Sequence, residues 1–171
     1  MTEAAAVPER DDVAEALAYL LRLLAARDYT RAELHAKLRL RKVDDAIAEA
    51  ALARLGELDL LDDGRVAAAH VRGREHRKGR LALAVDLKRR GLAPHLVDEA
   101  LNGLDDAHQR RAAEVVLAKE AWRFVAADPG KNRAKAAAFL RRRGFPGDIV
   151  AEAVDAAFPW DDAGVPSLRH R

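Results

Sequence analysis

The 171-residue chain contains no cysteine, which excludes disulfides and cysteine-ligated zinc. Aromatic residues are only 5% of the chain, so any core must be built mainly from aliphatic side chains. No apolar run approaches the roughly 18 residues that a membrane-spanning helix needs. The first residues, MTEAAAVPERDDV, lack the basic start and apolar stretch of a secretory signal. We therefore expect a cytoplasmic protein without a membrane partner.

Glycine and proline are also scarce, with 10 and 6 residues, and they stand where helices would begin or end. Half of the residues are hydrophobic, mostly Ala, Leu and Val, and both Ala and Leu favour helices. Apolar residues recur at helical spacing along most of the chain. The composition therefore predicts an all-α fold.

An internal repeat is the most informative feature of the sequence. LKRRGLAPHLVDEAL at 87–101, LRRRGFPGDIVAEAV at 140–154 and LRLRKVDDAIAEAAL at 38–52 align without a gap. A unit of about 50 residues with three short helices buries little surface alone, so the units should be three-helix bundles stacked in an elongated, curved array. The aligned apolar positions are Leu34, Leu83 and Ala136; Leu38, Leu87 and Leu140; Val43, Leu92 and Phe145; Ile47, Leu96 and Ile149; and Leu52, Leu101 and Val154.

Capping and turn signals set the expected boundaries. Thr30 and Glu33 form a capping-box pattern, Asp44 and Asp105 are expected N-caps, and Pro94 suits a first helical turn. Trp122 is expected in the core of the third repeat, with a partner-binding role as the alternative. The expected segments are a disordered arm at 1–11, three-helix repeats at 12–61, 62–104 and 105–158, and a tail at 159–171.

The net charge is only +2, but the cations are clustered. Residues 62–104 carry nine Lys and Arg against six Asp and Glu. Cations at the end of a helix complement its dipole, which explains one or two per helix. Three in a row spread around most of the helix, so their recurrence favours a basic face for a polyanion or an acidic protein. The recurring blocks are Arg39, Arg41 and Lys42; Lys88, Arg89 and Arg90; and Arg141, Arg142 and Arg143.

The densest basic stretch is HVRGREHRKGR at 70–80. A helix that starts near Val66 is expected to run into this stretch and to stop near Gly79. Arg74 and Lys78 would then lie one turn apart on the helix and repel each other unless a partner supplies anions. A solvated helix end is the simpler explanation of the same pattern.

No pattern in the sequence indicates catalysis or a metal site. Glycine-rich phosphate loops and the GxSxG and HExxH motifs are absent. The Asp-Asp pairs stand at expected helix starts, where anions stabilise the helix. We therefore expect no enzyme, no cofactor and no small-molecule substrate. The histidines contain no pair at the i, i+4 spacing of helical metal ligands: His35, His70, His76, His95, His108 and His170.

The order of these features resembles the RecX family over about residues 14–158. DDGRVAAAHVRGREHRKGRLALAVDLKRRGLAPHLVDEAL at 62–101 is similar to the central repeat of that family. RAKAAAFLRRRGFPGDIVAEAV at 133–154 is similar to its C-terminal repeat, and ALAYLLRLLAARDYTRAELHAKLRLRKV at 16–43 to its N-terminal repeat. One departure is Lys42, which stands where the other two repeats have glycine and leaves the shape of that turn open.

The resemblance implies a regulator without catalytic residues. It implies binding in the groove of the RecA–DNA filament and inhibition of RecA recombinase, ATPase and coprotease activities, with effects on homologous recombination, DNA repair and the SOS response. An alternative is direct binding of single- or double-stranded DNA by helix-turn-helix-like units, and a third is a helical scaffold unrelated to nucleic acid. The residues expected to contact RecA or DNA are Arg72, Arg74, Arg77, Lys78, Arg80, Lys88, Arg89, Arg90, Arg133, Lys135, Arg141, Arg142 and Arg143.

Overall fold

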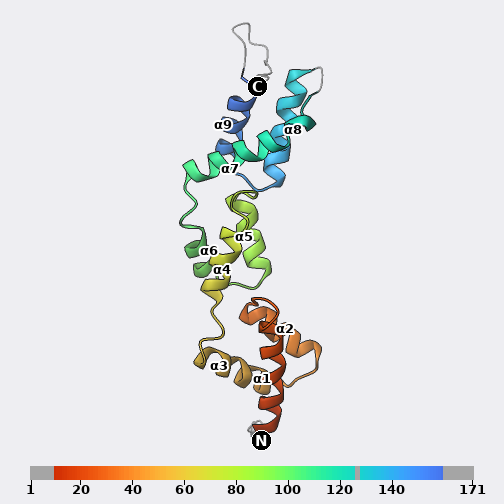
Figure 1. The fold of residues 1–171 in the computed structure, drawn as a ribbon, viewed down its shortest axis with the longest axis vertical. Coiled ribbons are helices and arrows are strands. Elements are labelled where there is room, and N and C mark those ends of the chain that lie inside the picture. The colour runs from red at the N-terminus through yellow and green to blue at the C-terminus, as the bar shows by residue number, and fades with distance from the viewer. Residues whose placement is uncertain (1–9, 126–127, 160–171) are drawn as a thin grey trace, which may run out of the picture.

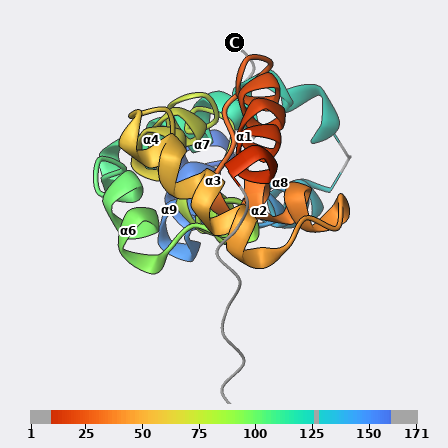
Figure 2. The same ribbon diagram turned by 90° about the horizontal axis from the view of Figure 1, so that it is seen from below.

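A computed structural model describes residues 10–125 and 128–159, and every regular element in those ranges is a helix. Three units follow one another along the long axis of the molecule (Figure 1), and they fall within one rounded outline when viewed along it (Figure 2). The predicted all-α, elongated repeat architecture is confirmed. The helices are α1 (Arg10–Leu24), α2 (Arg31–Leu40), α3 (Asp45–Glu57), α4 (Asp63–Arg72), α5 (Arg80–Arg89), α6 (Pro94–Leu101), α7 (Asp106–Lys119), α8 (Pro129–Arg142) and α9 (Gly147–Ala157), with a 3-10 turn at Ala121–Arg123.

All three units are built in the same way. The first and third helices pair, as α1 with α3, α4 with α6 and α7 with α9, and the second helix packs mainly on the third. Each unit encloses its own apolar core. The aligned Leu38, Leu87 and Leu140 have no exposed surface. The repeat alignment read from the sequence therefore predicts the core correctly at these positions.

The expected caps begin the expected helices. In the capping box, Thr30 Oγ1 accepts a hydrogen bond from the Glu33 N–H, and the Glu33 carboxylate accepts one from the Thr30 N–H. Asp44 and Asp105 accept hydrogen bonds from the first turns of α3 and α7. Pro94 is the first residue of α6, where its missing N–H costs no helical hydrogen bond.

Three helix starts lie earlier than expected. α4 begins at Asp63 rather than near Val66, because the Asp62 carboxylate accepts a hydrogen bond from the Arg65 N–H and caps the helix. α1 begins at Arg10, inside the expected 1–11 arm, because Asp11 and Asp12 in its first turn complement the helix dipole. The sequence predicts a turn at Asp128-Pro129-Gly130 and a helix from Arg133, but α8 begins at Pro129, because Asp128 caps it and proline suits the first position. The rest of the expected arm, 1–9, and of the expected tail, 160–171, lies outside the described residues.

The prediction for the basic stretch at 70–80 is wrong in one respect. α4 ends at Arg72, with Gly73 as its C-cap, and residues 74–78 form turns. Arg74 and Lys78 are therefore not neighbours on a regular helix, although the Lys78 N–H still bonds the Arg74 carbonyl at 2.9 Å. Gly73 explains the early stop, because glycine weakens a helix interior and is tolerated at its end.

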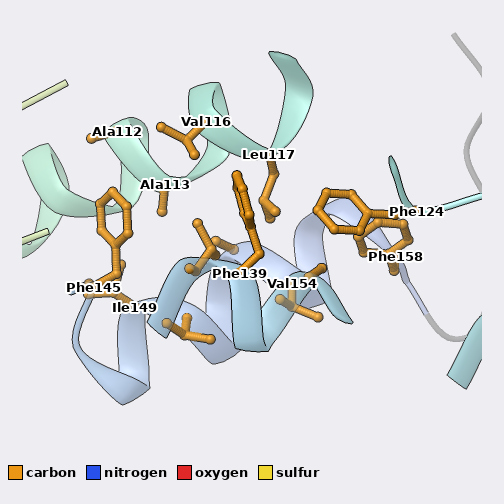
Figure 3. Packing of buried hydrophobic residues seen from close by; sticks show 14 residues of the cluster. Ala112, Ala113, Val116, Leu117, Phe124, Phe139, Phe145, Ile149, Val154 and Phe158 are labelled. Carbon is orange, nitrogen blue, oxygen red and sulfur yellow. The ribbon is translucent and has the colours of Figure 1, made fainter. Parts of the chain in front are cut away.

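The predicted core position of Trp122 is also wrong. α7 ends at Lys119, and Trp122 lies in the following 3-10 turn with 72% of its surface exposed. Phe124 takes the inward position instead, with its ring edge-on to Phe139 at 5.6 Å and to Phe158 at 6.1 Å between centroids. Figure 3 shows Phe124 beside Phe158 at one end of the third core.

Candidate functional site

The second helix of unit 2 ends against the start of the second helix of unit 1. Thr30 Oγ1 donates a 2.7 Å hydrogen bond to the carbonyl oxygen of Arg90, the C-cap of α5. The Arg90 guanidinium donates two more, of 3.0 and 2.9 Å, to the two carboxylate oxygens of Glu33. One arginine therefore joins unit 2 to the capping box of unit 1. This contact is termed junction 1–2.

The same positions of units 2 and 3 form junction 2–3 with different chemistry. The Gly79 N–H donates to the Arg143 carbonyl at 2.8 Å, and the Leu81 N–H donates to the Gly144 carbonyl at 3.0 Å. Gly79 aligns with Thr30 in the repeat, so a backbone donor replaces a hydroxyl. Helices α2, α5 and α8, joined end to end by the two junctions, are termed the second-helix column.

Side chains complete junction 2–3. Gln109 of α7 is buried, and its amide oxygen accepts a 2.7 Å hydrogen bond from the Arg80 N–H at the start of α5. The Arg143 guanidinium donates to the Arg77 carbonyl at 3.3 Å. This bond joins the turns at 74–78 to the end of α8, so the backbone of the basic stretch contacts the second-helix column.

A left-handed residue follows the arginine in each unit. Gly91 and Gly144 have φ of 77° and 78°, which favours glycine. Neither position has room for a side chain, since a Cβ would lie 2.4 Å from the Ala32 Cβ at Gly91 and 2.2 Å from the Ala82 nitrogen at Gly144. Lys42, at the aligned position of unit 1, has φ of 60°. The turn left open by the sequence therefore has the same left-handed form, at an end where no described unit packs against it.

The ion pair of junction 1–2 changes the pKa of both partners. Burial raises the pKa of Glu33, but the hydrogen bonds from Arg90 and from the Thr30 N–H, together with the Arg90 charge, outweigh burial and leave that pKa lowered. The hydrogen bond to Glu33 raises the pKa of Arg90. With side-chain exposures of 24% and 17%, the pair is shielded from solvent better than a surface salt bridge.

Most of the predicted contact cations are exposed. Arg80 is half-buried. Eight others are exposed and form no ion pair within residues 10–125 and 128–159, so their charges remain available to a partner. They are Arg72, Arg74, Arg77, Lys88, Arg89, Lys135, Arg141 and Arg142.

Four predicted contact cations have partners inside the protein. Arg90 forms junction 1–2, and Arg143 lies 4.0 Å from Glu120 besides its bond to Arg77. Arg133, with a side chain only 15% exposed, pairs with Asp155 and bonds the Phe158 carbonyl. These three arginines thus bind groups inside the protein, a role that the pattern of basic blocks did not reveal. The fourth cation with an internal partner is Lys78.

Lys78, just before α5, belongs to a small charged cluster around Asp86 of α5. Its ammonium group lies 2.6 Å from the Asp86 carboxylate, which also lies 3.6 Å from Nε2 of His70. Burial raises the pKa of Asp86, but the Lys78 and His70 contacts outweigh it and leave the pKa lowered. Burial and the charge of Arg74 hold the pKa of His70 below its usual range. Lys78 is therefore neutralised locally, unlike its neighbours in sequence.

The column arranges the exposed cations in register. Arg39, Lys88 and Arg141 occupy one repeat position in the last turns of α2, α5 and α8, and all three are exposed. Arg39 was not among the predicted contact residues, although the repeat alignment was sufficient to find it. At the next position Arg89 and Arg142 are exposed, but unit 1 has Leu40, which is 80% exposed. Glu33, the partner of Arg90, was read from the sequence only as a capping residue.

Other classes of site find no support in the described part of the chain. No group of three or more His, Cys, Asp or Glu there is arranged to hold a metal ion. No helix there is both long and apolar enough to cross a membrane.

Comparisons with known proteins agree with this architecture. Residues 16–55 match the family model described as RecX, first three-helix domain, and residues 62–101 match RecX, second three-helix domain. These matches fall on units 1 and 2. A crystal structure of RecX from Lactobacillus salivarius superposes with a TM-score of 0.79 at 23% identity, covering 86% of this chain and 97% of that one.

Curated relatives are similar over most of their length. The regulatory protein RecX of Chlorobaculum tepidum is 40% identical over 141 residues, which is 81% of this chain and 86% of that protein. The regulatory protein RecX of Deinococcus radiodurans is 38% identical over 160 residues, or 90% and 76%. With this identity and coverage, the chain belongs to the RecX family of regulatory proteins.

Proposed function

We propose that this protein binds the RecA filament on DNA and inhibits the recombinase, ATPase and coprotease activities of RecA, and so modulates homologous recombination and DNA repair. The observation that supports this proposal is the second-helix column, which repeats exposed cations along an elongated body. A filament is itself a repeating surface, and a repeated module can meet several of its subunits at once. We assign regulation to binding and no step to a catalytic residue.

Several weak contacts made together give high avidity without any single strong site. Inhibition also requires that the protein bind one conformational state of the filament more tightly than the others, because a ligand shifts an equilibrium only as far as it prefers one state. A body that spans neighbouring subunits binds best at one subunit spacing. Held at that spacing, the filament would be restrained from the changes that accompany ATP turnover.

Direct binding of DNA is the second candidate, favoured by the exposed cations that lack an ion pair within the described residues. Single-stranded DNA binders usually combine such cations with aromatic platforms. The 74–78 turns and α5 contain no Phe, Tyr or Trp, and Phe139, in the last turn of α8, is buried. If phosphate contacts alone provided the affinity, binding would weaken steeply as the salt concentration rises. The logarithm of the binding constant would fall against the logarithm of the salt concentration with a slope of about −0.7 per neutralised phosphate on single strands.

The test is a titration of RecA ATP hydrolysis on single-stranded DNA with the full chain. We expect inhibition that saturates at or below one protein per RecA subunit, with feeble binding to naked DNA under the same salt. The variant Lys88→Glu/Arg89→Glu should inhibit less well, because it reverses two exposed charges that no described residue pairs. Strong naked-DNA binding with unaltered RecA turnover would instead establish the second candidate.

A further inference from the structure

The middle unit exposes a mixed apolar and basic stripe on α5. Leu81 and Val85 are 57% and 46% exposed, and Lys88 and Arg89 are exposed as well. Their spacing of i, i+4, i+7 and i+8 places all four on one side of the helix. These four residues are termed the α5 stripe.

The stripe is not needed for the core of unit 2. Leu83 and Leu87, on the other side of α5, have no exposed surface and fill that core. A helix that is apolar on two sides normally has two neighbours. Within the described residues the second side of α5 meets none that buries these two side chains. A second apolar face therefore points to a contact outside the unit.

The repeat provides an internal comparison. At the positions of Leu81 and Val85, α2 has Ala32 and Ala36, and α8 has Ala134 and Ala138. The same three-helix module is built with alanine there twice, so neither large side chain is required by the fold. The middle unit differs from its neighbours in its surface, at the centre of the column.

The charges beside the apolar pair indicate the chemistry of the partner. Lys88 and Arg89 have no ion pair within the described residues, and the one acid on α5, Asp86, is held by Lys78. A DNA backbone would meet the two cations but would leave Leu81 and Val85 in water, because phosphate contacts reward charge alone. An acidic protein surface with its own apolar side chains meets all four.

We propose that the α5 stripe is a protein-binding surface that takes an acidic, amphipathic segment of the filament protein, with apolar side chains against Leu81 and Val85 and carboxylates against Lys88 and Arg89. The inference rests on the proposed function, since it names the contact by which the middle unit holds the filament. The other exposed cations of the second-helix column then remain available to contact DNA phosphates. A few residues near the centre of an interface usually contribute most of its affinity, and the α5 stripe lies at the centre of the column.

The experiment measures binding of the full chain to RecA filaments on immobilised single-stranded DNA with a non-hydrolysable ATP analogue, and to the same DNA without RecA. The variant Leu81→Ala/Val85→Ala gives unit 2 the residues that units 1 and 3 already have, so it should fold. The control Leu58→Ala/Val115→Ala removes the leucine at the C-cap of α3 and a valine of α7, which are 45% and 46% exposed. Circular dichroism and light scattering check the fold and the oligomeric state of each variant.

We expect Leu81→Ala/Val85→Ala to bind filaments at least about tenfold more weakly at every salt concentration, with naked-DNA binding unchanged, and the control to stay within about twofold of the wild type. Filament binding equal to that of the wild type would overturn the stripe while leaving the proposed function intact. Equal losses on filaments and on naked DNA, or a wild-type dimer that the variant dissociates, would overturn it in favour of nucleic acid or a second copy. A wild type that binds no filament would overturn the proposed function itself.

Discussion

Junctions 1–2 and 2–3 join the same positions of the repeat through different bonds. At junction 1–2 a threonine hydroxyl and a shielded Arg90–Glu33 pair make the contact. At junction 2–3 two backbone N–H groups bond two backbone carbonyls, and glycine replaces threonine. The repeated module therefore keeps the geometry of its docking contacts more constant than their chemistry. Charge and pH should therefore affect the first junction, whereas an added Cβ at Gly79, the position that threonine occupies in the first junction, should disrupt the second.

The largest effect is expected from Gly79→Ala at junction 2–3. A Cβ at this position would lie 2.2 Å from the Gly144 carbonyl oxygen, and backbone cannot move aside as a side chain can. We expect a loss of about 3 kcal/mol in the free energy of unfolding, measured by urea denaturation. The control Gly103→Ala, with nothing within 4 Å of the new Cβ, should change it by less than about 0.5 kcal/mol. Equal stability of the two variants would show that the units do not dock as described.

Arg90→Ala should cause the next largest loss, at junction 1–2. It removes both hydrogen bonds to Glu33, and bonds to a charged group typically contribute about 1.5–3 kcal/mol. The loss should shrink in high salt, whereas the loss caused by Gly79→Ala should not. Arg89→Ala, one residue away and exposed, is the matched control and should be nearly neutral. If urea denaturation finds the two arginine variants alike, the ion pair does not hold the junction.

Thr30→Ala should cost about 1 kcal/mol through loss of the cap on α2, and more through loss of the bond to Arg90. Thr30→Ser retains the hydroxyl and should restore nearly all of the stability. Thermal or urea denaturation of the three proteins measures both effects. A serine variant as unstable as the alanine variant would indicate that the methyl group, not the hydroxyl, matters.

The smallest effect is the pH dependence that Glu33 contributes at junction 1–2. Because the pKa of Glu33 is lowered in the folded protein, its contribution is present above the ordinary glutamate pKa of about 4.3 and is lost as the pH falls through the lowered value. The difference in unfolding free energy between wild type and Glu33→Gln should therefore be constant from pH 7 to 5 and vanish in stronger acid. A difference that persists at pH 2 would assign the effect to packing rather than to charge.

The sequence was sufficient for the helices, the cores and the repeat because these depend on local signals. Aligned leucines such as Leu38 and Leu87 predict the same buried position, and caps such as Thr30 and Asp105 mark helix starts. The family resemblance of the three repeats was likewise visible in their residues. The predicted helix boundaries were wrong where two local signals competed. Gly73, for example, ends α4 within a stretch that the sequence predicts to be helical.

Contacts between units could not be predicted, because they join residues 29 to 66 positions apart in the sequence. Arg90 and Arg89 look equivalent in the sequence, yet one forms an ion pair with Glu33 and the other faces solvent. Trp122 and Phe124 are similarly close in sequence, and only the geometry of the turn after α7 decides which enters the core. The basic blocks thus predicted a cationic surface but not which cations belong to the fold.

The most direct test of the whole account compares Gly79→Ala with Gly103→Ala and the wild type in RecA ATP hydrolysis on single-stranded DNA. Each unit has its own apolar core, so far-UV circular dichroism should show that helix content survives when junction 2–3 is broken. We predict that Gly79→Ala needs at least about ten times more protein for half-inhibition, because separated units lose avidity, while Gly103→Ala matches the wild type. A folded Gly79→Ala protein that inhibits as well as the wild type would contradict the claim that the docked column is what restrains the filament.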